Sequence, residues 1–322
     1  MEYRKLISFG KSSYVISLPK SWVIQQKLKK GDLIYLDETD HNLILSSTQE
    51  KNPAEKEINI NVEGKSLRRI QREIITSYIK DYKSIILFGK DLKEKAKGIQ
   101  DTIQNLMALE VMEQTSTRIV AKDFLDMNNV SIFNLVRKID VILRSMIEDC
   151  VKMFVEDNYE NIHHRDNDVN RLSFLIFRTI EFGLENASFM FKKQRLNSRD
   201  MLGIWWFVFN LEAIGDDVKR ISRYMQNLKL DQKQKEKLVY LLEETKNSYL
   251  KVLKGYHNKD VNLVHEVLED KNNLLEQGEL FYEENKKVEN MGLLIGCLRS
   301  VVTNIHNLGR VIYQHEFIER KL

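Results

Sequence analysis

The chain has 322 residues, of which 50 are Lys or Arg and 47 are Asp or Glu, so its formal charge at pH 7 is only +3. Hydrophobic residues make up 43% and charged residues 30%, which excludes a disordered chain and a membrane-embedded one. The length suggests about two domains. The only prolines are Pro19 and Pro53, so no proline interrupts a helix in the rest of the chain.

The cysteines and the first residues indicate the cellular compartment of the protein. Cys150 and Cys297 each lie within an apolar helical pattern, which favours two buried thiols over a disulfide or a zinc site. The start of the chain, Met1 to Lys5, lacks the apolar run of a secretion signal. No stretch approaches the roughly 18 apolar residues that a spanning helix needs. We therefore expect a cytoplasmic protein without membrane insertion.

Residues 1–50 are predicted to form a small β-rich domain. Short strand-like runs alternate with turn signals, and a short helix is expected after Pro19. Four short strands and one short helix bury too little apolar surface to be stable alone, so the domain needs a partner. Residues 1–31 carry seven Lys or Arg against one Glu, a local charge of +6. This charge indicates a nucleic-acid contact, although a solvated basic face explains it equally well.

Residues 54–127 are predicted to form a small α+β domain. The apolar pattern predicts a strand at 58–62, a helix after Ser66, a strand at 84–88, a helix at 91–105 and strands near 111–113 and 118–121. Gly89 stands alone after its strand, so we see no glycine-rich phosphate-binding fingerprint.

Residues 129–322 are predicted to be helical, because apolar residues recur at steps of three and four. Helices are expected at about 132–154, 159–187, 198–225, 231–253, 261–275 and 291–312. The layout repeats faintly between residues 129–228 and 231–322, and short connections imply antiparallel neighbours. We therefore expect a pair of three-helix bundles, in a protein that is mainly α with an N-terminal β part.

The most informative polar cluster contains Glu212 and Asp216. Because they lie four residues apart, both carboxylates project from one face of a helix. Gly215 between them costs about 1 kcal/mol relative to alanine, which hints at close packing or at close approach of a ligand. Spacing alone favours two solvated acids over a metal site. Asp166 and Asn170 share a face of the second helix and could supply oxygen ligands to a hard cation.

The remaining polar residues indicate no catalysis. His163 and His164 could bind zinc or iron, but a polar helix start, with aspartates at the positive end of the helix dipole, explains that segment better. The sequence contains no Ser/His/Asp arrangement, phosphate-binding loop or His-Glu-x-x-His motif. We do not expect an enzyme.

The N-terminal segment resembles a known DNA-binding family. The strings Arg4-Lys5-Leu6, Ser17-Leu18-Pro19-Lys20 and Lys30-Gly31-Asp32 resemble the swapped-hairpin domain of the AbrB/SpoVT type. The resemblance implies an obligate homodimer with interleaved hairpins. It also implies that basic side chains are presented to DNA, and the candidates are Arg4, Lys5, Lys11 and Lys20.

Residues 129–322 resemble the PhoU family of phosphate-uptake regulators, built of two three-helix repeats. The string Leu211-Glu212-Ala213-Ile214-Gly215-Asp216 is similar to that family's helix-three signature. The resemblance implies a divalent metal or iron at the first repeat, with Glu212, Asp216, Asp166 and Asn170 as the candidate ligands. In the second repeat Thr303 and Asn307 replace acids, so a metal is expected at the first repeat only.

The domain order resembles an archaeal arrangement, and three functions are compatible with it. The first is a DNA-binding transcriptional regulator that acts as a negative regulator of phosphate uptake and phosphate homeostasis. The second is an adaptor that restrains the ATPase of a phosphate ABC transporter, or its sensor, with residues 1–50 serving only dimerisation. The third and least favoured is a carboxylate-metal phosphohydrolase centred on Glu212 and Asp216.

Overall fold

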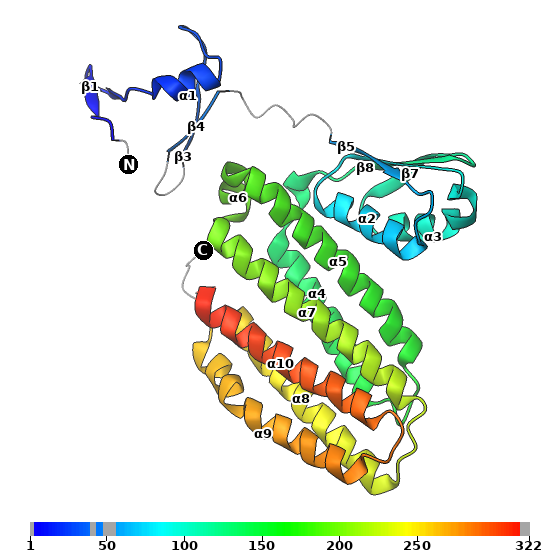
Figure 1. Ribbon diagram of the computed structural model, residues 1–322. Helices are drawn as coiled ribbons and strands as arrows, with labels where there is room; N and C mark the ends of the chain where they lie inside the picture. Colours follow the sequence, from blue (N-terminus) through cyan, green and yellow to red (C-terminus); the bar gives the residue numbers. More distant parts are fainter. Residues whose placement is uncertain (1–2, 39–42, 48–55, 316–322) are drawn as a thin grey trace. The chain divides into compact units, whose positions relative to one another are not determined.

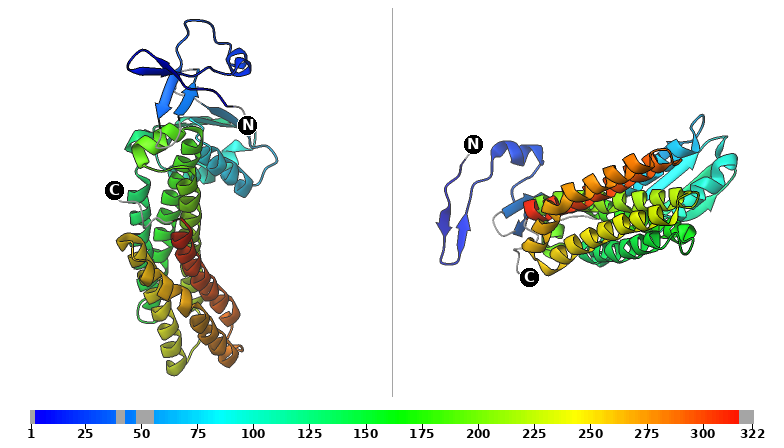
Figure 2. Two further views of the ribbon diagram at one scale, coloured as in Figure 1. Left: turned by 90° about the vertical axis from the view of Figure 1, so that its left-hand side faces the viewer. Right: turned by 90° about the horizontal axis from the view of Figure 1, so that it is seen from below.

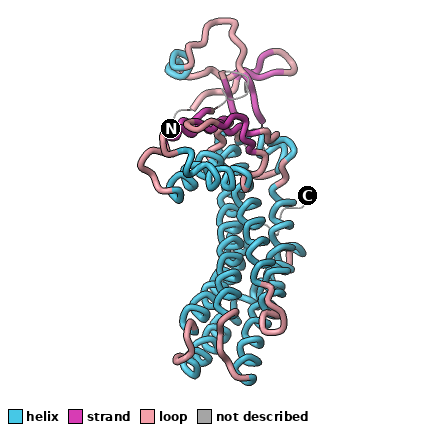
Figure 3. The backbone as a smooth tube through the Cα atoms, turned by 90° about the vertical axis from the view of Figure 1, so that its right-hand side faces the viewer, coloured by secondary structure: helices cyan, strands magenta, loops and turns pink. Residues whose placement is uncertain are grey.

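The computed structural model describes residues 3–38, 43–47 and 56–315. The chain divides into two compact units, residues 1–54 and 55–322 (Figure 1). Helix dominates the second unit, and Figure 3 shows its strands gathered into one sheet. The protein is therefore mainly helical with a small N-terminal β part, as the sequence predicts.

The described part of the first unit contains two separate antiparallel strand pairs and a short helix. The elements are β1 (Ile7–Phe9), β2 (Ser13–Val15), α1 (Lys20–Gln25), β3 (Tyr35–Glu38) and β4 (Leu43–Ser46). β1 pairs with β2, and β3 pairs with β4. Gly10 and Gly31 adopt φ values of 72° and 97°, a region that glycine enters without steric cost. These elements match the four strands and one helix expected from the sequence.

The second unit begins with the α+β layer. Its elements are β5 (Glu57–Asn61), α2 (Leu67–Ile79), β6 (Ser84–Phe88), α3 (Leu92–Gln104), β7 (Leu109–Gln114) and β8 (Arg118–Asp123). The sheet order is β5-β6-β8-β7; β5 and β6 are parallel, and β8 is antiparallel to both of its neighbours. α2 and α3 pack on one face of this sheet (Figure 1) and share a hydrophobic core with it. The predicted element order is confirmed.

A helical region follows, after a short 3-10 turn at Met127–Asn129. Its helices are α4 (Ile132–Val151), α5 (Tyr159–Glu185), α6 (Ala187–Gln194), α7 (Ser198–Met225), α8 (Gln232–Asn258), α9 (Val261–Asn285) and α10 (Met291–His315). α4, α5 and α7 pack against one another, and so do α8, α9 and α10.

The predicted helix starts agree within a residue, but most predicted helix ends differ from the observed ones; the fourth, for example, was expected to end near Leu253 and continues to Asn258. The second predicted helix ends at Glu185 because Asn186, at φ −127° and ψ 61°, leaves the helical conformation, and the short α6 follows it. The fifth was expected to end near Leu275 but continues to Asn285. In its last turns Phe281 is buried and Tyr282 packs against the hydrophobic core.

The two three-helix groups do not have separate cores. One continuous hydrophobic cluster runs from Met127 to Ile312, and α7 packs along α10 at the centre of it. The right-hand view of Figure 2 shows the yellow to red helices lying alongside the green ones. The helical region is therefore one body of two joined groups, because α7 and α10 each bury apolar residues against more than one neighbour.

The two cysteines differ in burial. Cys150 is buried and Cys297 only partly buried, so the expectation of a buried thiol holds fully for the first alone; both are free among the described residues. Across the parts of the chain that the structure describes, no helix combines the length and apolar character needed to cross a membrane.

Candidate functional site

The four basic residues predicted to contact DNA are all exposed in the first unit. Arg4 and Lys5 precede β1, Lys11 lies in the turn between β1 and β2, and Lys20 begins α1. These side chains therefore lie at the surface of the unit, where a phosphate backbone could reach them.

The same unit exposes its apolar side chains. Within residues 3–36 no residue is buried, and Tyr3, Phe9 and Leu33 are 87%, 70% and 72% exposed. Soluble proteins rarely leave contiguous apolar surface uncovered unless a partner packs on it. Residues 3–36 therefore form no buried apolar core of their own.

The acids predicted on two helices do meet in space, and a lysine lies between them. The Nζ atom of Lys219 donates hydrogen bonds to Oδ2 of Asp166 at 2.5 Å and to Oδ1 of Asp216 at 2.7 Å. Lys219 and Asp216 belong to α7, whereas Asp166 belongs to α5. Arg220 also bonds Oδ2 of Asp216, at 3.0 Å. Asp166 and Asp216 are therefore paired with cations of the chain itself.

Burial dominates the electrostatics of this cluster. Burial and the neighbouring charges of Asp216 and Asp166 raise the pKa of Glu212 to about 7. Burial also raises the pKa of Asp166, although Lys219 opposes that shift. Burial would lower the pKa of Lys219, but its hydrogen bonds to the two aspartates outweigh burial and leave that pKa raised. Lys219 is therefore an ammonium ion at neutral pH.

Gly215 and Asn170 complete the surroundings of Asp166. A Cβ on Gly215 would lie 3.2 Å from Cδ2 of Leu143 and 3.6 Å from Oδ1 of Asp166, so the glycine serves close packing of α7 on α4 and α5. Asn170 lies one turn after Asp166, and its Nδ2 is 3.4 Å from Oδ2 of that aspartate. Among the described residues, Oδ1 of Asp166 and Oδ1 of Asn170 are buried without a hydrogen-bond partner.

The arrangement fits an ammonium ion better than a metal ion. In the part of the chain that the structure describes, no group of three or more His, Cys, Asp or Glu side chains is placed to hold a metal. Glu212 and Asp216 lie on one face with Asp166 opposite, yet Lys219 fills the space between the aspartates. Binding of a divalent metal or iron at these residues stays a prediction, and the lysine argues against it.

The neutral residues of the second repeat have structural contacts. Thr303 donates to the carbonyl of Arg299 at 2.8 Å, one turn earlier in α10. Nδ2 of Asn307 donates to Oδ1 of Asn210 at 3.2 Å, which joins α10 to α7. Thr303 therefore bonds within its own helix, and Asn307 links two helices.

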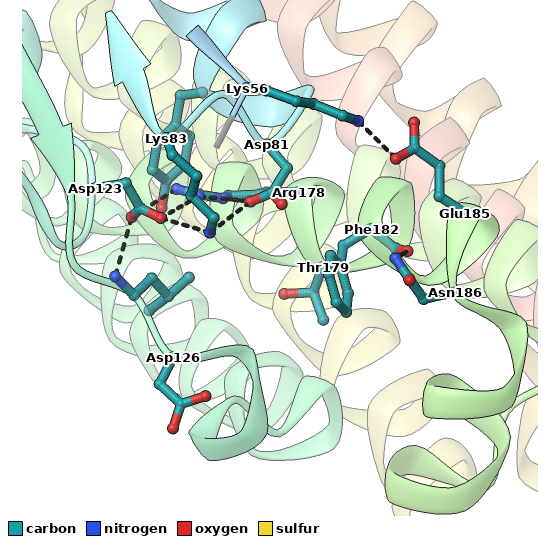
Figure 4. Close-up of polar contacts among 12 residues, drawn as sticks. Lys56, Asp81, Lys83, Asp123, Asp126, Arg178, Thr179, Phe182, Glu185 and Asn186 are labelled. Atoms are coloured by element: carbon teal, nitrogen blue, oxygen red, sulfur yellow. Dashed lines mark hydrogen bonds and ion pairs between the residues drawn. The ribbon is translucent and has the colours of Figure 1, made fainter. Parts of the chain in front are cut away.

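A second buried charge cluster escaped the sequence analysis (Figure 4). Arg178 on α5 is 0% exposed and donates to Oδ1 of Asp81 at 2.6 Å and to Oδ2 of Asp123 at 2.5 Å. Lys83 bonds the same two aspartates, at 3.1 and 2.8 Å. The guanidinium also lies 4.5 Å from the ring centre of Tyr78. This cluster holds the α+β layer on α5, and an arginine within the apolar run 172–180 was the available signal for it.

A third cluster joins the two helical repeats. Asp140 on α4 accepts hydrogen bonds from Nε of Arg144 at 2.8 Å and from the hydroxyl of Tyr249 at 3.1 Å. Nε2 of His257 lies 2.8 Å from its other oxygen. Tyr249 and His257 come from α8, so one buried carboxylate bridges α4 and α8. The sequence analysis did not single out Asp140.

Comparison with known proteins adds no relative: no family model, curated protein or solved structure matches this chain.

Proposed function

We propose that this chain is a DNA-binding transcriptional regulator that represses phosphate uptake and acts as a homodimer in the cytoplasm. One observation carries the proposal: the first unit combines a charge of +6 over residues 1–31 with apolar side chains that its own fold leaves exposed. The family resemblances of residues 3–45 and 129–322 indicate the process that is regulated, which is phosphate uptake.

The exposed apolar residues support dimerisation. Small β modules gain stability by burying apolar surface against a second copy, and a twofold pair uses the same patch on both copies. Tyr3, Phe9 and Leu33 are the most exposed large apolar residues of this unit. Covering them with a second unit would double the basic surface offered to DNA.

The basic residues support DNA as the partner. Arg4, Lys5, Lys11 and Lys20 are exposed, and lysine and arginine neutralise phosphates with release of counterions. Such contacts position a protein on DNA without reading sequence. The proposal therefore assigns these residues to affinity and leaves base recognition to other side chains of the unit.

A salt-dependent gel shift tests the proposal. Full-length protein is titrated on DNA upstream of phosphate-transport genes, with an Arg4/Lys5/Lys20→Ala variant and with a Lys229/Lys233/Lys287→Ala control, whose three lysines are exposed in the second unit. If a dimer loses six phosphate contacts, the slope of log K against log salt should fall by about 5. Equal binding by both triple variants would contradict the proposal.

The adaptor function is the second candidate, and an exposed apolar stripe favours it. Leu202, Trp206 and Phe209 lie on one face of α7 and are 64%, 50% and 48% exposed. The rings of Trp206 and Phe209 stack with their centres 5.5 Å apart. Exposed aromatic surface of this kind commonly marks a protein contact.

A pull-down separates the two candidates. The bait is full-length protein and the probe is the ATPase of the phosphate transporter, compared with a Trp206/Phe209→Ser variant. Capture that is lost in the variant while DNA binding persists supports the adaptor function. No capture, together with specific DNA binding, leaves the regulator as the function.

A further inference from the structure

The cluster between α5 and α7 already contains a cation. Lys219 follows Asp216 by three residues on α7 and reaches Asp166 on α5, so its ammonium joins the two helices. Its side chain is 23% exposed, whereas that of Asp166 is 2% exposed. This ammonium is therefore largely shielded from water and held by carboxylates from two elements.

Two carboxylate oxygens from different helices converge on the ammonium. They lie 2.5 and 2.7 Å from Nζ, as in short charge-assisted hydrogen bonds. An ion placed there would meet the same two oxygens that now meet the ammonium. A divalent cation and the ammonium cannot share this space, because like charges at such separation repel strongly in a partly buried site.

Two buried oxygen atoms close to the Lys219 ammonium accept no hydrogen bond among the described residues. Asp166 is 1% exposed, and within the described residues its Oδ1 has no hydrogen-bond partner. Oδ1 of Asn170, one turn along the same helix, is also buried without a partner there. Buried oxygens of this kind are normally satisfied, so these two are free to coordinate an ion.

We propose that the ammonium of Lys219 is the resident cation of this cluster and stands where a divalent cation would otherwise bind. The lysine fastens α5 to α7 and makes the helical region independent of metal. Removing the ammonium uncovers a site for a hard divalent cation, with Asp166, Asp216 and Asn170 as its oxygen ligands. This inference concerns the helical region alone and stands whether or not the chain binds DNA.

Thermal unfolding of the full-length chain with and without divalent cation tests the inference. Wild-type protein should show the same Tm in chelator and in millimolar calcium or manganese. A Lys219→Met variant should unfold about 5 °C or more lower in chelator, because it leaves the buried Asp166 unpaired and leaves Asp216 with Arg220 alone. Millimolar calcium or manganese should recover part of that loss, and calorimetry should show binding near one ion per chain.

Two variants serve as controls. Lys152→Met removes a cation whose ion pair with Glu148 is exposed on both sides, at 54% and 56%, so its Tm should change little and should not respond to calcium. Lys219→Met combined with Asp166→Asn should lose the recovery by calcium, because one of the two carboxylates is gone.

Either of two results would overturn the inference. One is a wild-type protein that retains a stoichiometric divalent ion after purification or is stabilised by added calcium. The other is a Lys219→Met protein whose Tm is indifferent to calcium and manganese. If that variant is unfolded in chelator, failure to regain helical circular dichroism when calcium is added counts as the second result.

Discussion

Three groups of buried charged side chains join distant elements of the second unit. Arg178 meets Asp81 and Asp123, Lys219 meets Asp166 and Asp216, and Asp140 meets Arg144, Tyr249 and His257. Replacing one partner of such a pair leaves the other as an uncompensated buried charge. Each pairing is therefore more costly to break than a surface ion pair.

Replacing Arg178 should destabilise the second unit strongly. Arg178→Met leaves Asp81 and Asp123 buried with only Lys83 as partner, and we expect the free energy of unfolding to fall by about 3–5 kcal/mol. Urea unfolding followed by circular dichroism measures this change. Lys83→Met removes a side chain that is 25% exposed and should cost less than half as much. Equal losses would show that Arg178 is not the main link.

The charge of Asp140 should make part of the stability depend on pH. Burial raises the pKa of Asp140, but hydrogen bonds from His257 and Arg144 outweigh burial and hold the pKa below its usual value. A carboxyl with a lowered pKa stabilises the fold above its unfolded pKa, about 4, and this contribution is lost as the pH falls through the folded pKa.

The matching experiment compares wild type with Asp140→Asn across a pH series. At pH 7 the variant should be less stable by about 2–3 kcal/mol, because the amide keeps the shape but loses the charge-assisted hydrogen bonds. The difference should shrink as the pH falls below about 4. A difference that stays constant down to the acid transition would refute this role of the charge.

At the scale of elements, two helical glycines differ in how closely a neighbouring element approaches them. A Cβ on Gly255 of α8 would lie 2.6 Å from Cγ2 of Val264 and 3.0 Å from the carbonyl oxygen of Asp260. A Cβ on Gly296 of α10 would have no atom within 4 Å among the described residues. Both glycines lie inside helices, so they form a matched pair.

The two alanine substitutions should have opposite signs. Gly255→Ala should cost about 1–3 kcal/mol, because α9 must move away from α8. Gly296→Ala should stabilise by up to about 1 kcal/mol, because alanine favours the helix and meets no neighbour. Thermal unfolding of both variants decides the matter, and stabilisation by Gly255→Ala would contradict the observed packing.

Much of the element order could be predicted, because its signals are local. Asn197 with Asp200, and Asp231 with Gln234, form capping boxes at the starts of α7 and α8, which the sequence analysis placed within a residue. α6 was missed because it carries no capping box and its apolar pattern continues that of α5. The end of α9 was missed because the apolar residues there, Leu280, Phe281 and Tyr282, are consecutive and do not recur at steps of three and four.

At the scale of the whole molecule, the first unit should control the oligomeric state. Phe9→Asp combined with Leu33→Asp places charges on residues that are 70% and 72% exposed, so the single chain tolerates them. In a dimer that covers these residues the charges would be buried, and the dimer should dissociate. Analytical ultracentrifugation of full-length protein reports the change.

Leu202→Asp is the matched control for that experiment. Leu202 is 64% exposed but lies on α7 of the second unit, outside the proposed dimer surface. Its substitution should leave the dimer intact. Dissociation by Leu202→Asp and not by the double variant would place the interface on the helices instead.

The sequence by itself determined the type and order of the elements apart from α6, the basic character of residues 1–31, and the faces that carry Glu212 with Asp216 and Asp166 with Asn170. These are local properties, set by periodicity and caps within a few turns of chain. Only the tertiary structure decided that Lys219 lies between the acids, that Arg178 holds the α+β layer, and that both repeats share one core. Those contacts depend on how helices rotate and cross, and residues separated by 53 or 97 positions leave no common period in the sequence.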